Sequence, residues 1–285
     1  MTTSFDMTAI KSVLILLRFP FSLFLLPIYL LALAHVANPQ TPWVIFFVLH
    51  VLVYPSSNAY NSLIDQDTES VGGIVAPPPP PPVLGPMTWL MDVCAVGISF
   101  FGVRPGFAGA VAFMILMSRL YSAPWPRLKQ YPVLSFLMVC SLQGAFTFLS
   151  VVYGLGGDAF NTVVLGKALL CSALVGSAYP LSQVFQHKED AKRGDMTLSR
   201  LLGYRGTFVF SGVGMLLSTV LIWGLEPIQR ALVFVGSMLP AFCYLCYWMK
   251  KVWQSPQYAN FSHSLKLNLL WATGLNVCFG LYLII

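Results

Sequence analysis

The chain has 285 residues, of which 57% are hydrophobic and only 9% are charged. Soluble domains carry about 25% charged residues, so this composition excludes an ordinary soluble protein and is typical of a polytopic membrane protein. The formal net charge of +6 comes without a basic run interleaved with aromatic residues, so nucleic acid is not an expected partner. The basic residues are instead expected to set the topology and to face membrane lipid.

Apolar segments of about 18 to 25 residues follow one another along the chain, and this is the length that a helix needs to cross a membrane. Lipid offers the backbone no hydrogen-bonding partner, so such segments are expected to span it as helices. The sequence therefore predicts an all-α membrane protein with a single transmembrane domain over residues 1–285. The nine expected spans are 12–36, 42–62, 87–104, 106–122, 132–152, 162–186, 204–224, 228–249 and 264–285.

The basic residues predict the orientation of these helices. With a cytoplasmic N-terminus, thirteen of the sixteen Lys and Arg residues lie at cytoplasmic helix ends, and Arg104, Lys167 and Arg230 lie on the opposite side. Cytoplasmic ends of membrane helices are enriched in positive charge. We therefore expect the N-terminus in the cytoplasm and the C-terminus outside, in the inner membrane if the source is bacterial.

Acidic residues concentrate in two of the expected cytoplasmic loops. Six of the ten acids follow either the second or the sixth span, whereas the extracellular connections are short and nearly uncharged. The chemistry is therefore expected on the cytoplasmic face. The six acids are Asp65, Asp67, Glu69, Glu189, Asp190 and Asp195.

The helix ends before these loops form an internal repeat. Residues 54–65 and 179–190 align without a gap and share Tyr, Pro, Ser and the closing Asp at four of twelve positions. Asn58 aligns with Gln183 and Asn61 with Gln186, so the amides are also kept. The second and sixth spans run in the same direction, so the repeat is parallel. Chance similarity between polar helix ends is the simpler alternative.

Each repeat places an amide and an acid four residues apart, which brings both side chains to one helix face about 6 Å apart along the axis. Asn61, Asp65 and Glu69 extend this stripe over two turns, and Gln186 with Asp190 forms a matching stripe. Such oxygen ligands suit Mg²⁺, which shares its remaining positions with water and phosphate. Nearby Lys and Arg residues then indicate a diphosphate site rather than a path for free cations.

These basic and amide residues also have simpler interpretations. Lys and Arg at helix ends can act as topology determinants alone. Arg18 can extend its charge to the membrane surface. Gln143 can form an interhelical hydrogen bond instead of orienting an acceptor.

Two motifs and a basic loop resemble the UbiA superfamily of intramembrane prenyltransferases. Asn61-x-x-x-Asp65-x-x-x-Glu69 resembles its first acidic motif, and residues 186–194 resemble the second, usually Asp-x-x-x-Asp-x-x-x-Gly. Residues 121–129 resemble the basic loop after the fourth helix, and Arg18 with Pro20 resembles the start of the first. The resemblance covers essentially the whole chain. It implies nine helices around a central cavity, and an isoprenyl diphosphate held by Mg²⁺ on both motifs at the cytoplasmic face.

The resemblance, together with the stripes, assigns roles to individual residues. The catalytic residues are expected to be Asp65, Asp190 and Lys129. The expected metal ligands are Asn61, Asp65, Glu69, Gln186, Glu189 and Asp190. The expected substrate-binding residues are Arg18, Asn58, Asn61, Tyr121, Arg127, Gln143, Gln183, Lys192 and Arg193.

The chain departs from the family's pattern in both motifs. Gln186 stands where the second motif usually has Asp, so one anionic ligand is missing, and Glu189 can supply the charge. Glu69 replaces a more usual Asp. The loop after the first motif lacks the family's Lys or Arg, so Lys192 and Arg193 are expected to contact the far phosphate oxygens.

Three functions remain open at this stage. The first is transfer of the isoprenyl group from a prenyl diphosphate to a lipophilic acceptor, such as an aromatic one. The second is cyclisation, in which the substrate's own double bond captures the allylic cation; the altered second motif keeps it open. The third is a transporter, which places ionisable residues near the bilayer midplane and often carries inverted repeats. Transport is less favoured because the acids lie at helix ends and the repeat is parallel.

Overall fold

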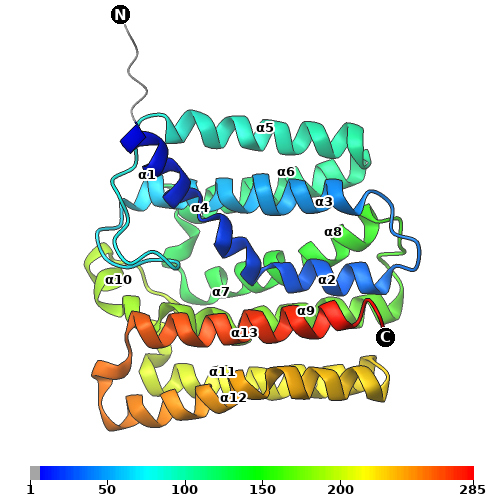
Figure 1. The fold of residues 1–285 in the computed structure, drawn as a ribbon. Helices are drawn as coiled ribbons and strands as arrows, with labels where there is room; N and C mark the ends of the chain where they lie inside the picture. The colour runs from blue at the N-terminus through cyan, green and yellow to red at the C-terminus, as the bar shows by residue number, and fades with distance from the viewer. Residues whose placement is uncertain (1–6) are drawn as a thin grey trace, which may run out of the picture. The chain divides into compact units, whose positions relative to one another are not determined.

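The computed structural model of the chain describes residues 7–285, and it is built from helices and the loops between them (Figure 1). Among these residues there is no β-strand, and an isolated bridge pairs Val71 with Ile74. The predicted all-α class is therefore confirmed. The helices form two compact units, one of residues 7–23 and Trp43–Arg127 and the other of Phe24–Pro42 and Leu128–Ile285.

The first unit is organised around one polar helix, α4 (Tyr54–Asp65). This helix packs against α1, α5 and α6, and α5 packs against α6. Its other elements are α1 (Met7–Leu17), the 3-10 segment η1 (Phe19–Phe24), α3 (Pro42–Phe47), the π-helical segment η2 (Val48–Val53), α5 (Leu84–Gly102) and α6 (Pro105–Ser122).

An apolar core joins α1, α4 and α5 in this unit. Leu16 and Leu17 of α1 are almost fully buried against Ala59 of α4, and Leu84 and Met91 of α5 complete the cluster. The small Ala59 allows α1 to approach α4 closely, as small residues do at membrane helix interfaces. This core buries the apolar side of α4, and polar residues on its other sides contact α6.

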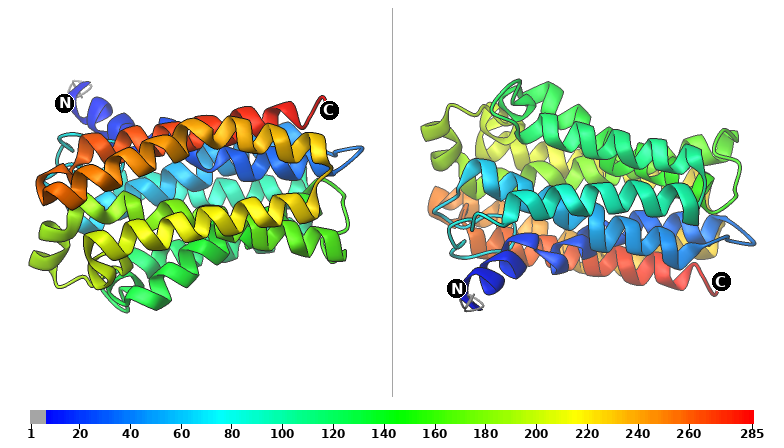
Figure 2. Two further views of the ribbon diagram at one scale, coloured as in Figure 1. Left: turned by 90° about the horizontal axis from the view of Figure 1, so that it is seen from below. Right: turned by 90° about the horizontal axis from the view of Figure 1, so that it is seen from above.

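The second unit contains the longest helices. Helix α9 packs against α11, α12 packs against α11 and α13, and α2 packs against α8 and α13; Figure 2 shows α11, α12 and α13 side by side. Its elements are α2 (Leu26–His35), η3 (Leu128–Gln130), α7 (Pro132–Cys140), η4 (Ser141–Phe146), α8 (Thr147–Gly154), α9 (Thr162–Gln183), η5 (Val184–Gln186), α10 (His187–Arg193), α11 (Leu198–Leu225), α12 (Ile228–Gln254), η6 (Pro256–Tyr258) and α13 (Phe261–Leu281).

Gly144 makes the approach between η4 and α9 possible. A Cβ atom built on this glycine would lie 2.6 Å from the backbone of Ser172, a distance that no real side chain tolerates. The Ser172 hydroxyl also accepts a hydrogen bond from the backbone N–H of Ala145, at 3.1 Å. The π-helical segment that contains Gln143 is therefore packed directly on α9.

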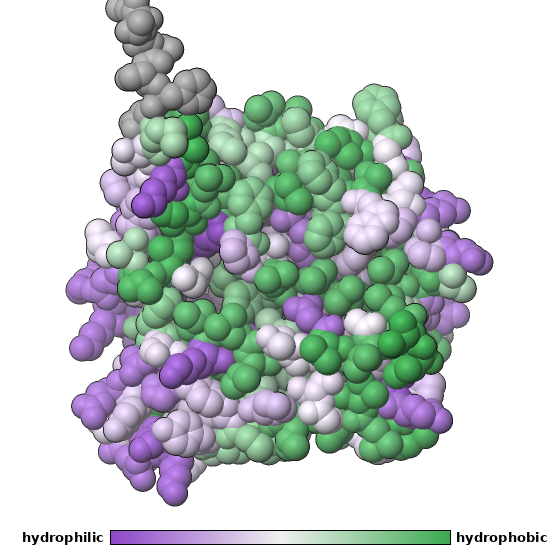
Figure 3. All heavy atoms as spheres, in the orientation of Figure 1, coloured by the Kyte–Doolittle hydropathy of each residue, from purple (hydrophilic) through white to green (hydrophobic). Residues whose placement is uncertain are grey.

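Helices form near the predicted segments, but the first predicted span is not one continuous α-helix. The span expected at 12–36 is divided, because Arg18 has a left-handed backbone (φ 50°) and Pro20 cannot donate a hydrogen bond. Seven helical segments are long and apolar enough to cross a membrane. Helices α6 and α13 form where expected but are not among these seven. Hydrophobic residues cover most of the visible face of α5 (Figure 3).

A buried cluster of charges joins the helix ends of the second unit. Glu226, which follows α11, lies 2.6 Å from the Lys167 ammonium of α9 and 3.5 Å from the Arg230 guanidinium of α12. Arg230 also donates a hydrogen bond to the backbone carbonyl of Tyr282, at 3.0 Å. Lys167 and Arg230, which the sequence analysis placed on the side opposite the cytoplasm, both pair with this single acid.

Removing the charge of Glu226 is expected to destabilise the protein strongly. The variant Glu226→Gln leaves the Lys167 ammonium buried without its carboxylate, and breaking a buried pair in this way costs about 3–5 kcal/mol. The exposed Lys250→Gln variant is the control, with an expected change below about 0.5 kcal/mol. Thermal unfolding in detergent measures both, and equal melting temperatures would show that the cluster contributes no stability.

Candidate active site

The first acidic motif lies at the C-terminal end of α4. The helix ends at Asp65, because Gln66 takes a left-handed conformation with φ 49° and closes the last turn onto the Ser62 carbonyl. Asn61 and Asp65 therefore share a helix face as predicted. Glu69 lies beyond the helix end and is exposed, so its expected place on the same helical stripe is wrong.

The end of α6 and the loop after it provide partners for this face. The Ser122 hydroxyl donates a hydrogen bond to Asn61 Oδ1 at 2.7 Å. The Arg127 guanidinium lies 3.4 Å from Asp65 Oδ1, and the carboxylate of Asp65 is 4% exposed. Tyr121, in the last turn of α6, is half-buried. Asp65 and Arg127, predicted to bind metal and phosphate respectively, thus form an ion pair.

Arg18 joins the same group of residues from the break between α1 and η1. It is buried, and one of its terminal nitrogens donates a hydrogen bond to the Ser62 hydroxyl at 2.6 Å. It lies within electrostatic range of Asp67 and Asp65. Gly72, in the loop after α4, packs on the Arg18 guanidinium so closely that a Cβ atom would overlap it. Arg18 is therefore held inside the protein and does not extend to the membrane surface.

The backbone of this group is unusual. Arg18, Gln66 and Arg127 are three of the four non-glycine residues with positive φ among residues 7–285. Such conformations cost free energy and cluster at functional sites, where the surrounding structure holds them. We call Arg18, Asn61, Asp65 and Arg127, which gather at the end of α4, the first half-site.

The second acidic motif follows a change of helix type. Helix α9 ends at Gln183, η5 makes one 3-10 turn to Gln186, and α10 then carries Glu189 and Asp190. The expected stripe of Gln186 and Asp190 is therefore interrupted by the end of the 3-10 turn. Gln183 is buried, and its Oε1 atom has no hydrogen-bond partner among the residues described.

Both acids of α10 have basic neighbours. Glu189 forms an ion pair with Arg193 one turn later. Asp190 is buried, accepts a hydrogen bond from the Thr197 hydroxyl at 3.4 Å, and lies within electrostatic range of Lys129 and Arg193.

Lys129 is itself buried in η3, and the division between the units falls just before this segment. The basic loop 123–131 thus contributes Arg127 to one unit and Lys129 to the other. We call Lys129, Glu189, Asp190 and Arg193 the second half-site.

Several residues near the half-sites were not assigned from the sequence. Asp67 and Asp195 were noted as loop acids, yet both are buried. Arg200, expected only as a topology determinant, lies within electrostatic range of Asp190 and donates a hydrogen bond to the Asp195 carbonyl oxygen. The one feature in the sequence that could have indicated these three residues is that each lies near an acidic motif.

Three further predicted substrate-binding residues are not members of either half-site. Lys192 is exposed on α10, and Asn58 and Gln143 are half-buried.

The donor atoms of both half-sites suit a hard divalent cation. Carboxylate and amide oxygens are what Mg²⁺ prefers, and it takes one or two carboxylates and completes its shell with water and phosphate. Within residues 7–285, no three His, Cys, Asp or Glu side chains form a group able to hold a metal ion by themselves. A magnesium ion here would therefore need oxygens from its ligand as well.

A sequence model of the UbiA prenyltransferase family matches residues 21–270, which include both motifs. No curated protein sequence matches the chain.

Solved structures also resemble the chain. A UbiA homologue from Archaeoglobus fulgidus has a TM-score of 0.64 at 16% identity, over 96% of this chain and 100% of that one. The A. fulgidus homologue bound to GPP and Mg²⁺ has a TM-score of 0.62 with the same identity and coverage. A digeranylgeranylglyceryl phosphate synthase has a TM-score of 0.60 at 16% identity, over 98% of both chains. These likenesses show the fold, and the family match identifies the sequence. The chain therefore belongs to the UbiA prenyltransferase family of integral membrane proteins.

Proposed function

We propose that the chain is a magnesium-dependent prenyltransferase, which transfers an isoprenyl group from a prenyl diphosphate to a lipophilic acceptor. One observation carries the proposal: carboxylates predicted to bind metal pair with cations predicted to bind phosphate, Asp65 with Arg127 and Glu189 with Arg193. A site with both signs of charge matches a ligand made of a divalent cation and an anion. Family membership supports this proposal, as do the UbiA homologue structures with Mg²⁺ and either GPP or DMAPP.

The carboxylates would hold the metal. Asp65 with Asn61 in the first half-site, and Asp190 with Glu189 in the second, offer the oxygen atoms that Mg²⁺ prefers. Bound Mg²⁺ would neutralise negative charge on the departing diphosphate. From the sequence, we propose that Gln186 occupies a ligand position in the second motif and offers a neutral amide oxygen in place of the usual carboxylate.

The basic residues would bind the diphosphate itself. Arg127 and Arg193 present planar guanidinium groups, which match phosphate oxygens with two parallel hydrogen bonds. Lys129 is buried, so its charge acts with little screening by water. As the bond between the allylic carbon and the diphosphate oxygen breaks, its electron pair leaves with the diphosphate, and these cations stabilise the charge that develops.

The apolar helices would protect the allylic cation from water until it reacts. With an aromatic acceptor, a ring carbon forms the new bond and the ring then loses a proton. Gln143 lies in the π-helical segment η4, a helix type frequent at functional sites, and is proposed to orient the acceptor. Gln183, whose carbonyl oxygen is buried, is proposed as a second polar contact to the substrate.

A terpene cyclase is the second candidate function. Gln186 in place of the usual acid is the observation that keeps this function open, because the second motif departs from the usual prenyltransferase pattern. In that reaction the substrate's own double bond captures the cation and no acceptor is needed. For either reaction, the excess of basic residues supports placing the site on the cytoplasmic face.

The two motif aspartates are expected to be essential. Asp65→Asn and Asp190→Asn keep the side-chain shape and remove the charge, and each should reduce Mg²⁺-dependent diphosphate release at least 100-fold, about 2.7 kcal/mol of barrier. The exposed loop variant Asp158→Asn is the matched control and should keep wild-type activity. Full activity in both motif variants, with normal membrane insertion, would refute the site.

The need for an acceptor distinguishes the two reactions. Purified protein is incubated with geranyl, farnesyl or geranylgeranyl diphosphate and Mg²⁺, with and without a panel of lipophilic aromatic acceptors. A transferase is expected to release diphosphate at a substantial rate only with an acceptor, because nothing else captures the cation. Cyclic hydrocarbons or alcohols formed without an acceptor would assign the chain as a cyclase.

Restoring the usual acid in the second motif tests the role of Gln186. The variant Gln186→Asp adds a negative ligand, so it is expected to retain activity and to lower severalfold the Mg²⁺ concentration that gives half-maximal rate. Magnesium titrations of the variant and of wild type measure this. Loss of all activity in a folded variant would argue that residue 186 does not occupy a ligand position.

A further inference from the structure

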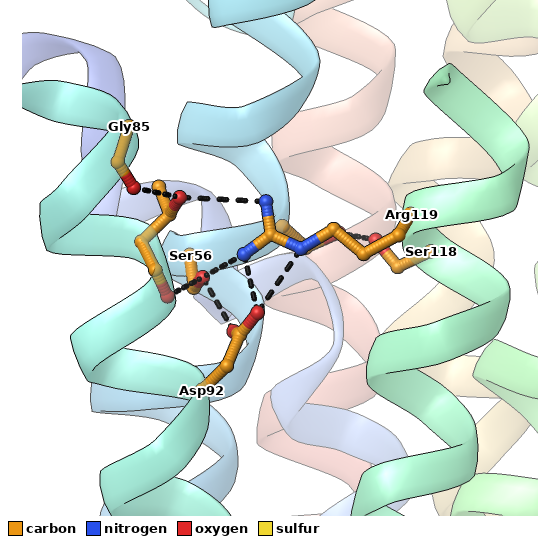
Figure 4. A network of polar contacts seen from close by, with 7 residues as sticks. Ser56, Gly85, Asp92, Ser118 and Arg119 are labelled. Carbon is orange, nitrogen blue, oxygen red and sulfur yellow. Dashed lines mark hydrogen bonds and ion pairs between the residues drawn. The ribbon is translucent and has the colours of Figure 1, made fainter.

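A buried ion pair outside the half-sites joins three helices of the first unit (Figure 4). Arg119 of α6 donates through Nε to Asp92 Oδ2 of α5 at 3.0 Å, and a second guanidinium nitrogen pairs with the same oxygen. The Ser56 hydroxyl of α4 donates to Asp92 Oδ1 at 2.7 Å, and Arg119 donates to Ser56 at 3.2 Å. The side chains of Arg119 and Asp92 are 11% and 7% exposed.

The Arg119 guanidinium has hydrogen-bond partners along its edges and an aromatic ring against its face. Beyond Asp92 and Ser56, one of its nitrogens lies 3.4 Å from the Thr88 hydroxyl. Its central carbon lies 4.0 Å from the ring centroid of Tyr60, which is on α4 one turn before the acidic helix end. Tyr60 thus has a guanidinium on one face of its ring, which suits a cation–π contact.

Three further contacts continue along α4, with partners from α6 and from the loop that follows it. Successive contact residues on α4 are four residues apart, and their partners are four and then five residues apart. The contacts therefore follow one another along α4, and along α6 and its loop, towards the first half-site. We call this row the polar seam. Its pairs are Ser57 with Ser118, whose hydroxyls are in contact, Asn61 with Ser122 at 2.7 Å, and Asp65 with Arg127 at 3.4 Å.

We infer that Asp92 and Arg119 are positioning residues, which set the register of α4 against α6 and thereby hold Asp65 beside Arg127. A slip of one helical turn would move α4 by about 5.4 Å. Arg119 and Asp92 would keep each other but would both lose Ser56, and Arg119 would also lose the ring of Tyr60. A buried polar group left without its hydrogen-bond partner is destabilising, and more so when the group is charged. The hydroxyl and amide pairs of the seam carry no charge and are weaker, so the contacts that the ion pair makes with Ser56 and Tyr60 select the register of α4. The inference rests on the proposed function, because the affinity for a diphosphate is used to detect a change in the register of α4 against α6.

The first test compares binding in Asp92→Asn and Arg119→Gln with that in wild type. The probe is farnesyl thiodiphosphate with Mg²⁺, which resists ionisation, so the measurement is an affinity and not a rate. Each variant is expected to bind at least 10-fold more weakly at a temperature where it is folded. Arg119→Lys keeps the charge but loses the planar guanidinium. Its affinity for the probe should lie between that of these two variants and that of wild type.

Glu226→Gln is the matched control, because it also breaks a buried ion pair but has no contact with α4 or α6 among the described contacts of Glu226. Its melting temperature should fall by a similar amount while its affinity for the probe stays within about twofold of wild type. If this control weakens binding as much as Asp92→Asn does, the effect follows stability alone and the positioning role is overturned.

A second test restores the register by a different bond. Ser57→Cys and Ser118→Cys, placed in the Asp92→Asn background, are joined by mild oxidation, and the linked peptides are identified by mass spectrometry. The disulfide should form more slowly than with Asp92 present, and once formed it should bring the affinity back to within about threefold of wild type. Reduction should abolish the recovery. Unchanged disulfide formation, or no recovery, would contradict the inference.

The two proposals fail in different ways. If wild type does not bind the probe, the proposed function is overturned, and the rate of disulfide formation still tests the register by itself. If wild type binds the probe and folded Asp92→Asn and Arg119→Gln bind equally well, the positioning role is overturned and the proposed function stands.

Discussion

Pairing of buried acids with Arg and Lys is the interaction on which this structure depends. The helices are apolar, and an ionised side chain among them is very costly unless an opposite charge and hydrogen bonds satisfy it. Asp92 with Arg119 joins three helices of the first unit, and Glu226 with Lys167 joins helix ends of the second. Neither pair belongs to the half-sites, and each joins apolar helices through charged side chains.

The same interaction has a different consequence at the acidic motifs. Asp65 is buried, whereas its partner Arg127 has a side chain 20% exposed and lies 3.4 Å away, in a loop rather than a helix. An ion pair with one member accessible can exchange partners with a ligand that carries both signs of charge. In the proposed function, the metal would take the carboxylate and the diphosphate would take the guanidinium. The charges of the half-site would then be balanced both before and after binding.

Much of the fold followed from composition and length, because apolar segments of membrane-spanning length have few alternatives to helix. The positions of Asn61 and Asp65 on one helix face also followed from spacing. Three features did not. The first span breaks at Arg18 because a left-handed residue and a proline interrupt it, and Glu69 leaves the stripe because α4 ends four residues earlier. Arg119 was interpreted only as a topology determinant, since its partner lies 27 residues away in the sequence and such non-local pairs have no local signal.

The central claim is that one magnesium-bound prenyl diphosphate is the ligand of this chain. Calorimetric titration of the purified protein with farnesyl thiodiphosphate, with Mg²⁺ and then with the metal chelated, tests it most directly. The account predicts one ligand per chain, bound in the presence of Mg²⁺ and at least 100-fold more weakly when the metal is removed. Equal affinity with and without Mg²⁺, or two ligands per chain, would contradict it.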